Sequence, residues 1–307
     1  FGEAVNGLSK LSDGRLLKEA INADPISWLG EEHLEKFGNS IEILVKLLDP
    51  DQRLPVHYHP NQSFAKEKLH MNHGKTEAWI ILDAPVGAKV GIGFKKQMSK
   101  AEVAALVKAH DSQGLLDSLV FKEVKAGDAV FVPAGVAHAI ESGIFVLELQ
   151  EPTDLSILLE WDGFAVDGDK DGHLNLGFDT ALDALRLSPL SEAEDKEIIS
   201  RFESSAAKSH PIFKSVADSF FRADYLTGDD KKVEAGFGIF LCLTGNGELV
   251  FENVRVPKSN ILPGRTGLGA PLSCLDSARF GIAWGALGAA MDCYDQAVRY
   301  SKERIQF

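Results

Sequence analysis

The sequence is poor in the features that mark several protein classes. Cysteine is scarce: Cys242, Cys274 and Cys293 are the three in 307 residues, they are far apart, and they form no C-x-x-C pair. A disulfide framework is therefore not expected, and reduced thiols favour a cytoplasmic protein. Basic residues are outnumbered 45 to 32 by acidic ones, and the net charge of −13 argues against nucleic acid or an anionic membrane as the main partner.

Long apolar runs are missing as well. The longest weakly polar run, residues 280–291, is too short to span a bilayer. The first residues contain no basic segment followed by an apolar one, so we expect no signal peptide. Apolar residues nevertheless make up 45% of the chain, enough for the core of one large domain or two medium ones.

Short apolar segments separated by glycine and proline turns dominate the first half. Strands are expected at 40–48, 75–82, 86–94, 120–124, 129–132, 145–149 and 155–161. Helical spacing occurs before residue 40, and capping boxes at Ser99–Glu102 and Ser191–Glu194 predict two further helices, the second reaching about residue 202. Strands are expected again at 221–226 and 238–243. We therefore predict a mainly β fold, a small antiparallel barrel or jelly roll with helical insertions.

Four potential metal ligands lie in three motifs. The motifs read P-V-H-Y-H-P at 55–60, G-K-T-E-A-W at 74–79 and P-A-G-V-A-H at 133–138. They contain His57, His59, Glu77 and His138. Residues two apart on a strand share one face, so His57 and His59 are expected to point the same way. An isolated histidine is more often structural, but three imidazoles and a carboxylate in this combination predict a site for a borderline metal such as zinc.

The three motifs resemble those of class I mannose-6-phosphate isomerases, which are zinc-dependent cupins. The family pattern is Q-x-H-P, then G-K-T-E-x-W, then G-D-x-x-x-x-P-A-G-x-x-H. His57 stands where glutamine is common, whereas His59, Glu77 and His138 match directly. The segment Q-E-P-T-D at 150–154 resembles the Q-E-P-[ST]-D segment that follows. The resemblance covers roughly residues 1–248.

This resemblance implies an aldose–ketose isomerase of carbohydrate metabolism that interconverts mannose 6-phosphate and fructose 6-phosphate. It implies Zn²⁺ as the cofactor, held by His57, His59, Glu77 and His138, and a small phosphosugar as the substrate. Lys75, two residues before Glu77, is the expected catalytic residue, because its charge can face a sugar hydroxyl. The residues do not identify the proton-transfer base, the phosphate-binding residues or the oligomeric state.

The character of the sequence changes near Glu248. Residues 248–307 resemble acyl-CoA dehydrogenases, most closely glutaryl-CoA dehydrogenases, at the end of their middle β-domain and the first helix of their C-terminal domain. One long helix is expected over 271–304, and Arg304 matches a position that helps to bind FAD. The rest of that family has no counterpart here. A natural fusion, an engineered join and an error of sequence assembly would each give this pattern.

The two resemblances predict four regions. They are a metal-binding cupin barrel with a helical insertion at 1–160, an acidic loop and helical connector at 161–209, the start of an incomplete second cupin-like module at 210–250, and an acyl-CoA-dehydrogenase-like tail at 251–307.

Two alternative functions stay open beside the isomerase. The first is a non-catalytic cupin that binds a metal or a sugar, because the resemblance implies an arginine in a second barrel, beyond the point where this chain diverges. The second is a fragment of a flavin-dependent acyl-CoA dehydrogenase, which rests on the tail alone.

Overall fold

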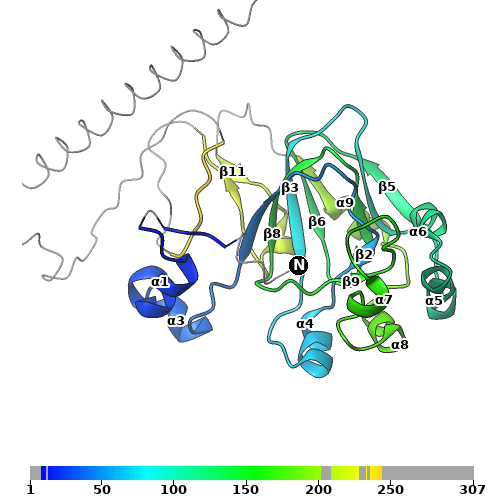
Figure 1. Ribbon diagram of the computed structural model, residues 1–307. Coiled ribbons are helices and arrows are strands. Elements are labelled where there is room, and N and C mark those ends of the chain that lie inside the picture. Colours follow the sequence, from blue (N-terminus) through cyan, green and yellow to red (C-terminus); the bar gives the residue numbers. More distant parts are fainter. Residues whose placement is uncertain (1–7, 12, 202–208, 228–232, 234–235, 244–307) are drawn as a thin grey trace, which may run out of the picture. The chain divides into compact units, whose positions relative to one another are not determined.

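The computed structural model of the chain describes residues 8–11, 13–201, 209–227, 233 and 236–243 (Figure 1). The chain divides into two units, Phe1–Ile239 and Phe240–Phe307, and the fold described below belongs to the first. Among the described residues, no helix is long and apolar enough to cross a membrane. The helix expected over 271–304 lies outside the described residues.

Two antiparallel sheets of five strands each form the centre of the first unit. The first sheet has the order β1 (Leu44–Leu48), β8 (Phe145–Gln150), β3 (Glu77–Asp83), β6 (Asp128–Val132) and β10 (Ile199–Arg201). The second has the order β5 (Leu119–Glu123), β4 (Lys89–Phe94), β7 (His138–Ile140), β2 (His57–Tyr58) and β9 (Ile157–Leu158). Neighbours in both orders are distant in sequence, as in a jelly roll, and the described strands do not join into one closed barrel.

The core between the two sheets follows from the alternation of side chains along each strand. Trp79 and Ile81 of β3 pack against Val90 and Ile92 of β4, and all four are fully buried. Every second residue of β3 therefore faces the second sheet. The register pairs Trp79 with Glu148 of β8, so Glu148 also lies on the inner face.

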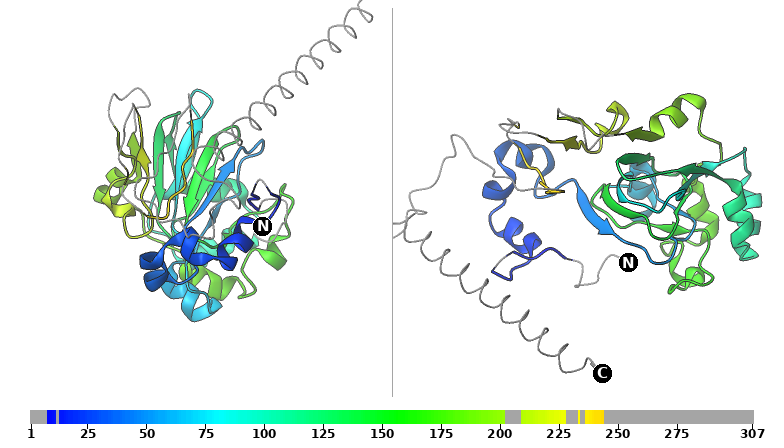
Figure 2. Two further views of the ribbon diagram at one scale, coloured as in Figure 1. Left: turned by 90° about the vertical axis from the view of Figure 1, so that its left-hand side faces the viewer. Right: turned by 90° about the horizontal axis from the view of Figure 1, so that it is seen from above.

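The outer faces of both sheets are covered by other parts of the chain. Apolar residues of 209–225, including Ile212, Phe213 and Phe221, pack on Ala78 and Phe131 of the first sheet. This segment contains β11 (His210–Pro211), the short helix η4 (Ser215–Ala217) and β12 (Asp224–Tyr225). The second sheet is covered by the cluster that includes residues of α5, α6, α8 and η3. The two views in Figure 2 place these helices outside the sheets.

The helices are short and have recognisable ends. Their bounds are α1 Leu17–Ala23, α2 Pro25–Leu29, α3 Glu31–Phe37, α4 Gln62–Phe64, η2 Ala65–Leu69, α5 Lys100–Lys108, α6 Ser112–Ser118, α7 Gly168–Asp171, α8 Phe178–Ala181, η3 Leu182–Ala184 and α9 Glu192–Ile198. Both predicted capping boxes are confirmed, with Ser99 and Glu102 beginning α5 and Ser191 and Glu194 beginning α9. Gly30, at φ 83°, separates α2 from α3.

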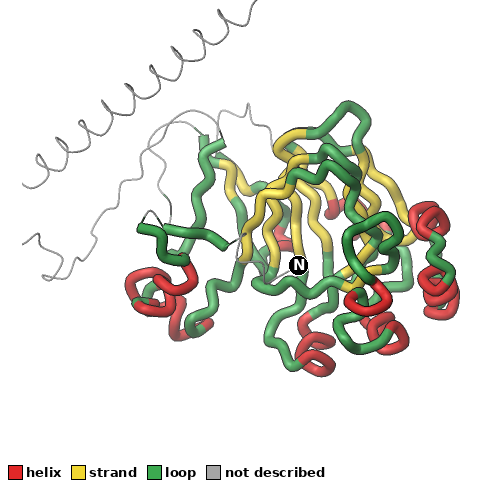
Figure 3. Tube along the Cα trace, in the orientation of Figure 1, coloured by secondary structure: helices red, strands yellow, loops and turns green. Residues whose placement is uncertain are grey.

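The mainly β prediction is confirmed, and Figure 3 shows the strands gathered at the centre with helices around them. Four details were wrong. The strand expected over 155–161 is reduced to Ile157–Leu158. The helix expected to reach residue 202 ends at Ile198, because Ile199–Arg201 pairs with β6. The strand expected over 221–226 is reduced to Asp224–Tyr225, and no strand forms at 238–243. The boundaries of the four predicted regions remain predictions.

The inner core predicts a stability difference between two apolar side chains of the first sheet. Ile81 is fully buried between the sheets, whereas Leu47 on the edge strand β1 is 54% exposed. We expect Ile81→Ala to lower the free energy of unfolding by about 2–5 kcal/mol, through lost burial and the cavity that remains. The matched control Leu47→Ala should change it by about 0.5 kcal/mol or less. Urea denaturation measures both, and equal losses would contradict the described orientation of β3.

Candidate metal centre

The four predicted ligands come together between the two sheets. His57 is the first residue of β2, His138 is the first residue of β7, and the two are paired across the second sheet. His59 follows β2 directly. Glu77 opens β3 in the first sheet. Three imidazoles from one sheet therefore meet a carboxylate from the other (β2, β3 and β8 are labelled in Figure 1).

The cluster is compact and almost completely buried. The ligand atoms of the three histidines lie within 4.8 Å of one another. The Nε2 atoms of His57 and His138 are 3.0 Å apart. The Glu77 carboxylate contacts two of the three rings. Its Oε2 lies 3.0 Å from His59 Nε2, and its Oε1 lies 3.3 Å from His138 Nε2. None of the four residues is more than 9% exposed.

Backbone carbonyl groups fix how the three rings are protonated. Each Nδ1 lies 2.7–2.8 Å from a carbonyl oxygen, in the pairs His57–Pro55, His59–Leu155 and His138–Val136. A carbonyl oxygen only accepts hydrogen bonds, so Nδ1 is the donor in each pair. In a neutral imidazole the other nitrogen then carries a lone pair, and in all three rings this is the Nε2 that faces the cluster. Such outer hydrogen bonds orient the histidine ligands of metal sites.

Burial keeps the rings of His57 and His59 neutral. It lowers the pKa of His59 to about 3, with the charge of Lys75 acting in the same direction, and it lowers the pKa of His57 well below its ordinary value. For Glu77, burial opposes ionisation, but Lys75 and the nearby histidines outweigh it, and its pKa is well below the ordinary range. At neutral pH the cluster therefore presents the neutral rings of His57 and His59 and the ionised carboxylate of Glu77.

Lys75 lies at the edge of this cluster. It precedes β3 rather than lying on the strand, yet its Nζ is 3.0 Å from Glu77 Oε2 and 3.2 Å from His59 Nε2. Burial alone would lower the pKa of Lys75, but the charges of Glu77 and Glu148 outweigh it and raise that pKa. Lys75 is 5% exposed, so a buried ammonium group faces the same space as the predicted ligands.

The donor set fits a divalent metal ion. Trp79 Nε1 donates to Glu77 Oε1 at 3.0 Å, but the buried Oε2 accepts no hydrogen bond of good geometry, although Lys75 Nζ lies 3.0 Å away. Three lone pairs and an unsatisfied carboxylate oxygen that face one another are stabilised by a cation among them. The buried His57–His59–His138 cluster can therefore bind a metal ion. Nitrogen and oxygen donors of this kind suit borderline metals.

A row of ionisable side chains extends from the cluster along the inner face of the first sheet, and the sequence did not lead us to it. Glu148 of β8 is 4% exposed, and burial together with the charge of Glu77 raises its pKa to about 8. Lys46 of β1 pairs with Glu148 across the sheet, lies 3.6 Å from its carboxylate and contacts Asp154. The sequence feature that could have indicated this row is Glu148, a charged residue at an inward-facing position of β8, whose sequence F-V-L-E-L-Q is otherwise largely apolar.

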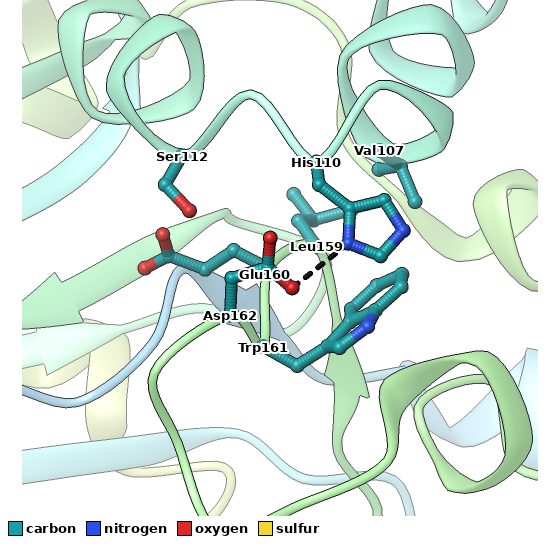
Figure 4. Close-up of a pocket in the computed structure, with 7 residues that line it drawn as sticks. All are labelled: Val107, His110, Ser112, Leu159, Glu160, Trp161 and Asp162. Atoms are coloured by element: carbon teal, nitrogen blue, oxygen red, sulfur yellow. Dashed lines mark hydrogen bonds and ion pairs between the residues drawn. The ribbon is translucent and has the colours of Figure 1, made fainter.

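A separate small pocket lies away from the cluster, near the end of β9 (Figure 4). It is shallow and is lined by Val107, His110, Ser112, Leu159, Glu160, Trp161 and Asp162. His110 Nδ1 lies 2.8 Å from Asp162 Oδ1, and the His110 ring packs edge-on against Trp161. None of the predicted site residues lines this pocket. Its lining residues come from the α5–α6 region and from residues 159–162, where the acidic loop begins.

Comparison with known proteins bears on both parts of the sequence. The chain is 37% identical over 154 residues to the mannose-6-phosphate isomerase of Streptococcus mutans, which covers 48% of this chain and 45% of that protein. It is 35% identical over 163 residues to the mannose-6-phosphate isomerase ManA of Bacillus subtilis, which covers 52% of this chain and 49% of that protein. The chain thus spans about half the length of the curated relatives it matches.

A solved structure and a family match complete the comparison. The crystal structure of a mannose 6-phosphate isomerase from Bacillus subtilis matches with a TM-score of 0.54 at 23% identity, covering 73% of this chain and 67% of that one, and so shows a shared fold. Residues 265–307 match the family described as acyl-CoA dehydrogenase, C-terminal domain. Both resemblances predicted from the motifs are therefore confirmed.

The lowered pKa of His59 predicts how stability changes with pH. Between about pH 6.5 and pH 3, unfolding exposes a ring that takes up a proton which the folded chain excludes, so acidification through this range lowers the free energy of unfolding. In chelator-treated protein, we expect His59→Gln to reduce the slope of stability against pH by at most about 1.4 kcal/mol per pH unit.

Glu148 acts in the opposite direction, because its raised pKa makes stability fall as pH rises through about 8. This contribution is common to the wild type and the His59→Gln variant, so it cancels in the difference between their slopes. Urea denaturation at a series of pH values provides the comparison. Parallel stability curves for the two proteins would contradict a neutral, buried His59.

Proposed function

We propose that the chain binds one zinc ion through His57, His59, Glu77 and His138 and takes part in the interconversion of mannose 6-phosphate and fructose 6-phosphate. The observation that carries this proposal is the buried cluster of three histidines whose ligand atoms lie within 4.8 Å of one another, with the Glu77 carboxylate against two of them. Three nitrogen donors and one oxygen donor suit zinc. Relatives named mannose-6-phosphate isomerase, at 35–37% identity over about half the chain, support the reaction.

Isomerisation of this kind moves a proton between two adjacent carbons of a sugar. A bound divalent metal supplies a Lewis acid that stabilises the negative charge developing on the sugar oxygens. Lys75 contributes a fixed, buried positive charge beside the ligands, and its Nζ can hold and donate a proton to a sugar oxygen. The backbone carbonyls behind the three rings keep each Nε2 directed toward the centre, so the geometry is set before a substrate arrives.

The substrate class agrees with the charge distribution near the cluster. A phosphosugar is an anion, and the chain as a whole carries a net charge of −13. Binding therefore requires local positive charge, which Lys75, just before β3, and the partly exposed Lys46 of β1 provide. The partner we propose is a small phosphosugar, without nucleic acid or membrane, and a cytoplasmic location remains our expectation.

A non-catalytic cupin is the second candidate. It would account for the buried histidine cluster without a proton-transfer base, which the residues do not identify. Such a protein would retain the metal without turning over the sugar phosphate. A flavin-dependent acyl-CoA dehydrogenase rests on residues 265–307 alone, which match one part of that family.

Removing a ligand tests the metal site and the reaction together. We expect about one zinc per wild-type chain and a loss of both zinc and isomerase activity in His59→Ala, because one of four donors is missing. Elemental analysis and an assay with mannose 6-phosphate measure the two quantities. His70→Ala is the matched control, since His70 is exposed. Zinc in the wild type without activity would favour the non-catalytic cupin, and no zinc would overturn the site.

Replacing Lys75 separates binding from chemistry. Lys75→Met keeps the length of the side chain but removes its charge and its proton. We expect the variant to retain zinc while kcat falls about 100-fold or more, as is typical for loss of a proton-transfer group. Activity equal to that of the wild type at full zinc occupancy would exclude a catalytic role for Lys75.

A further inference from the structure

The segment Glu151–Leu155 contacts the metal-ligand cluster in two places, the backbone just before Glu77 and the ring of His59. It follows β8, whose last residue Gln150 is paired with Glu77 across the first sheet. Glu151, Thr153 and Leu155 make these contacts, and each is between 6% and 8% exposed. A buried turn of this kind must satisfy its polar groups within the protein.

Glu151 and Thr153 hold the backbone on both sides of Lys75. The Glu151 carboxylate accepts a hydrogen bond from Thr76 N–H at 2.7 Å, and Glu151 N–H donates to Thr76 O at 3.0 Å. The Thr153 hydroxyl donates to Gly74 O at 2.6 Å. The three residues that lead into Glu77 are therefore fixed by a carboxylate on one side and a hydroxyl on the other.

The other side of this backbone is held as well. Lys75 N–H donates to Pro60 O at 3.0 Å. Gly74 packs so closely on residues 60–62 that a Cβ atom on it would lie 2.6 Å from their backbone atoms. Residues 74–76 are thus clamped between Pro60, which follows His59, and the Glu151–Leu155 segment. A small displacement of either support moves Lys75 and Glu77 together.

The same segment orients a ligand of the other sheet. Leu155 O accepts the hydrogen bond from His59 Nδ1 at 2.7 Å. One continuous run of five residues therefore fixes Glu77 through Thr76 and His59 through its ring nitrogen. Glu77 and His59 come from different sheets, and this run links them, as the Lys75–Pro60 hydrogen bond does on the other side.

We propose that Glu151 and Thr153 are positioning residues that set the distance between Glu77 and His59 and the position of Lys75. Neither touches the donor atoms of the cluster. They act through the backbone of residues 74–76. The inference rests on the metal site of the proposed function and does not require isomerase activity.

Paired substitutions at each position test the proposal with zinc affinity as the first readout. Glu151→Ala removes the acceptor for Thr76 N–H, whereas Glu151→Gln keeps an oxygen at the same distance. Thr153→Val removes the hydroxyl, whereas Thr153→Ser keeps it. We expect zinc affinity to fall about 10–100-fold in the Ala and Val variants, the range for loss of an outer hydrogen bond at a metal site. The Gln and Ser variants should recover most of it.

Asp128→Ala is the matched control for loss of a buried carboxylate. Asp128 is 1% exposed and accepts from Lys125 N–H at 3.0 Å, but it lies at the opposite end of β6 from the residue that pairs with Glu77. We expect this variant to lose stability in thermal unfolding while its zinc affinity stays within about threefold of the wild type. A purely structural role for Glu151 would give the same result as this control.

Competition with a chromogenic zinc chelator gives the affinities, and thermal unfolding shows that each variant is folded. Reduced affinity in the Ala and Val variants, with recovery in Gln and Ser, supports the proposal. Wild-type affinity in folded Glu151→Ala and Thr153→Val would overturn it while leaving the metal site intact. A wild-type chain without measurable zinc affinity would overturn both the site and this inference.

Discussion

The need for positive charge among four buried acceptors is the constraint on which the site depends. Carbonyl oxygens accept hydrogen bonds from Nδ1 of His57, His59 and His138, so each ring in its neutral form presents a lone pair to the same space. Glu77 adds an ionised carboxylate. In a region with little water, such a set is stable only beside a cation. The Lys75 ammonium group meets part of this need, and a divalent ion at the centre would meet it fully.

The two sheets make this arrangement because of where their strands begin. His57 and His138 are paired residues of the second sheet, and Glu77 is the first inward residue of β3 in the first sheet. Further along β3, Trp79 and Ile81 belong to the apolar core between the two sheets. The polar residues thus lie at the end of the inner face, where the apolar core stops. Glu148 and Lys46 continue the charged region across β8 and β1.

The sequence predicted the cluster well, because each ligand lies in a short motif whose neighbours are also distinctive. His57, His59, Glu77, His138 and Lys75 are all brought together. It did not predict Glu148 or Lys46, since their role depends on strand pairing that no local pattern contains. The strand expected at 238–243 was wrong for the same reason. An apolar stretch rich in β-formers becomes a strand only where a partner strand offers its hydrogen bonds.

The segment 209–225 packs on the outer face of the first sheet through Ile212, Phe213 and Phe221. The sheet that carries Glu77 is therefore covered by the residues that come next in the chain and does not depend on a complete second module for its burial. Among the described residues, the metal-ligand cluster and the cover of the sheet behind it thus lie within the stretch 44–225.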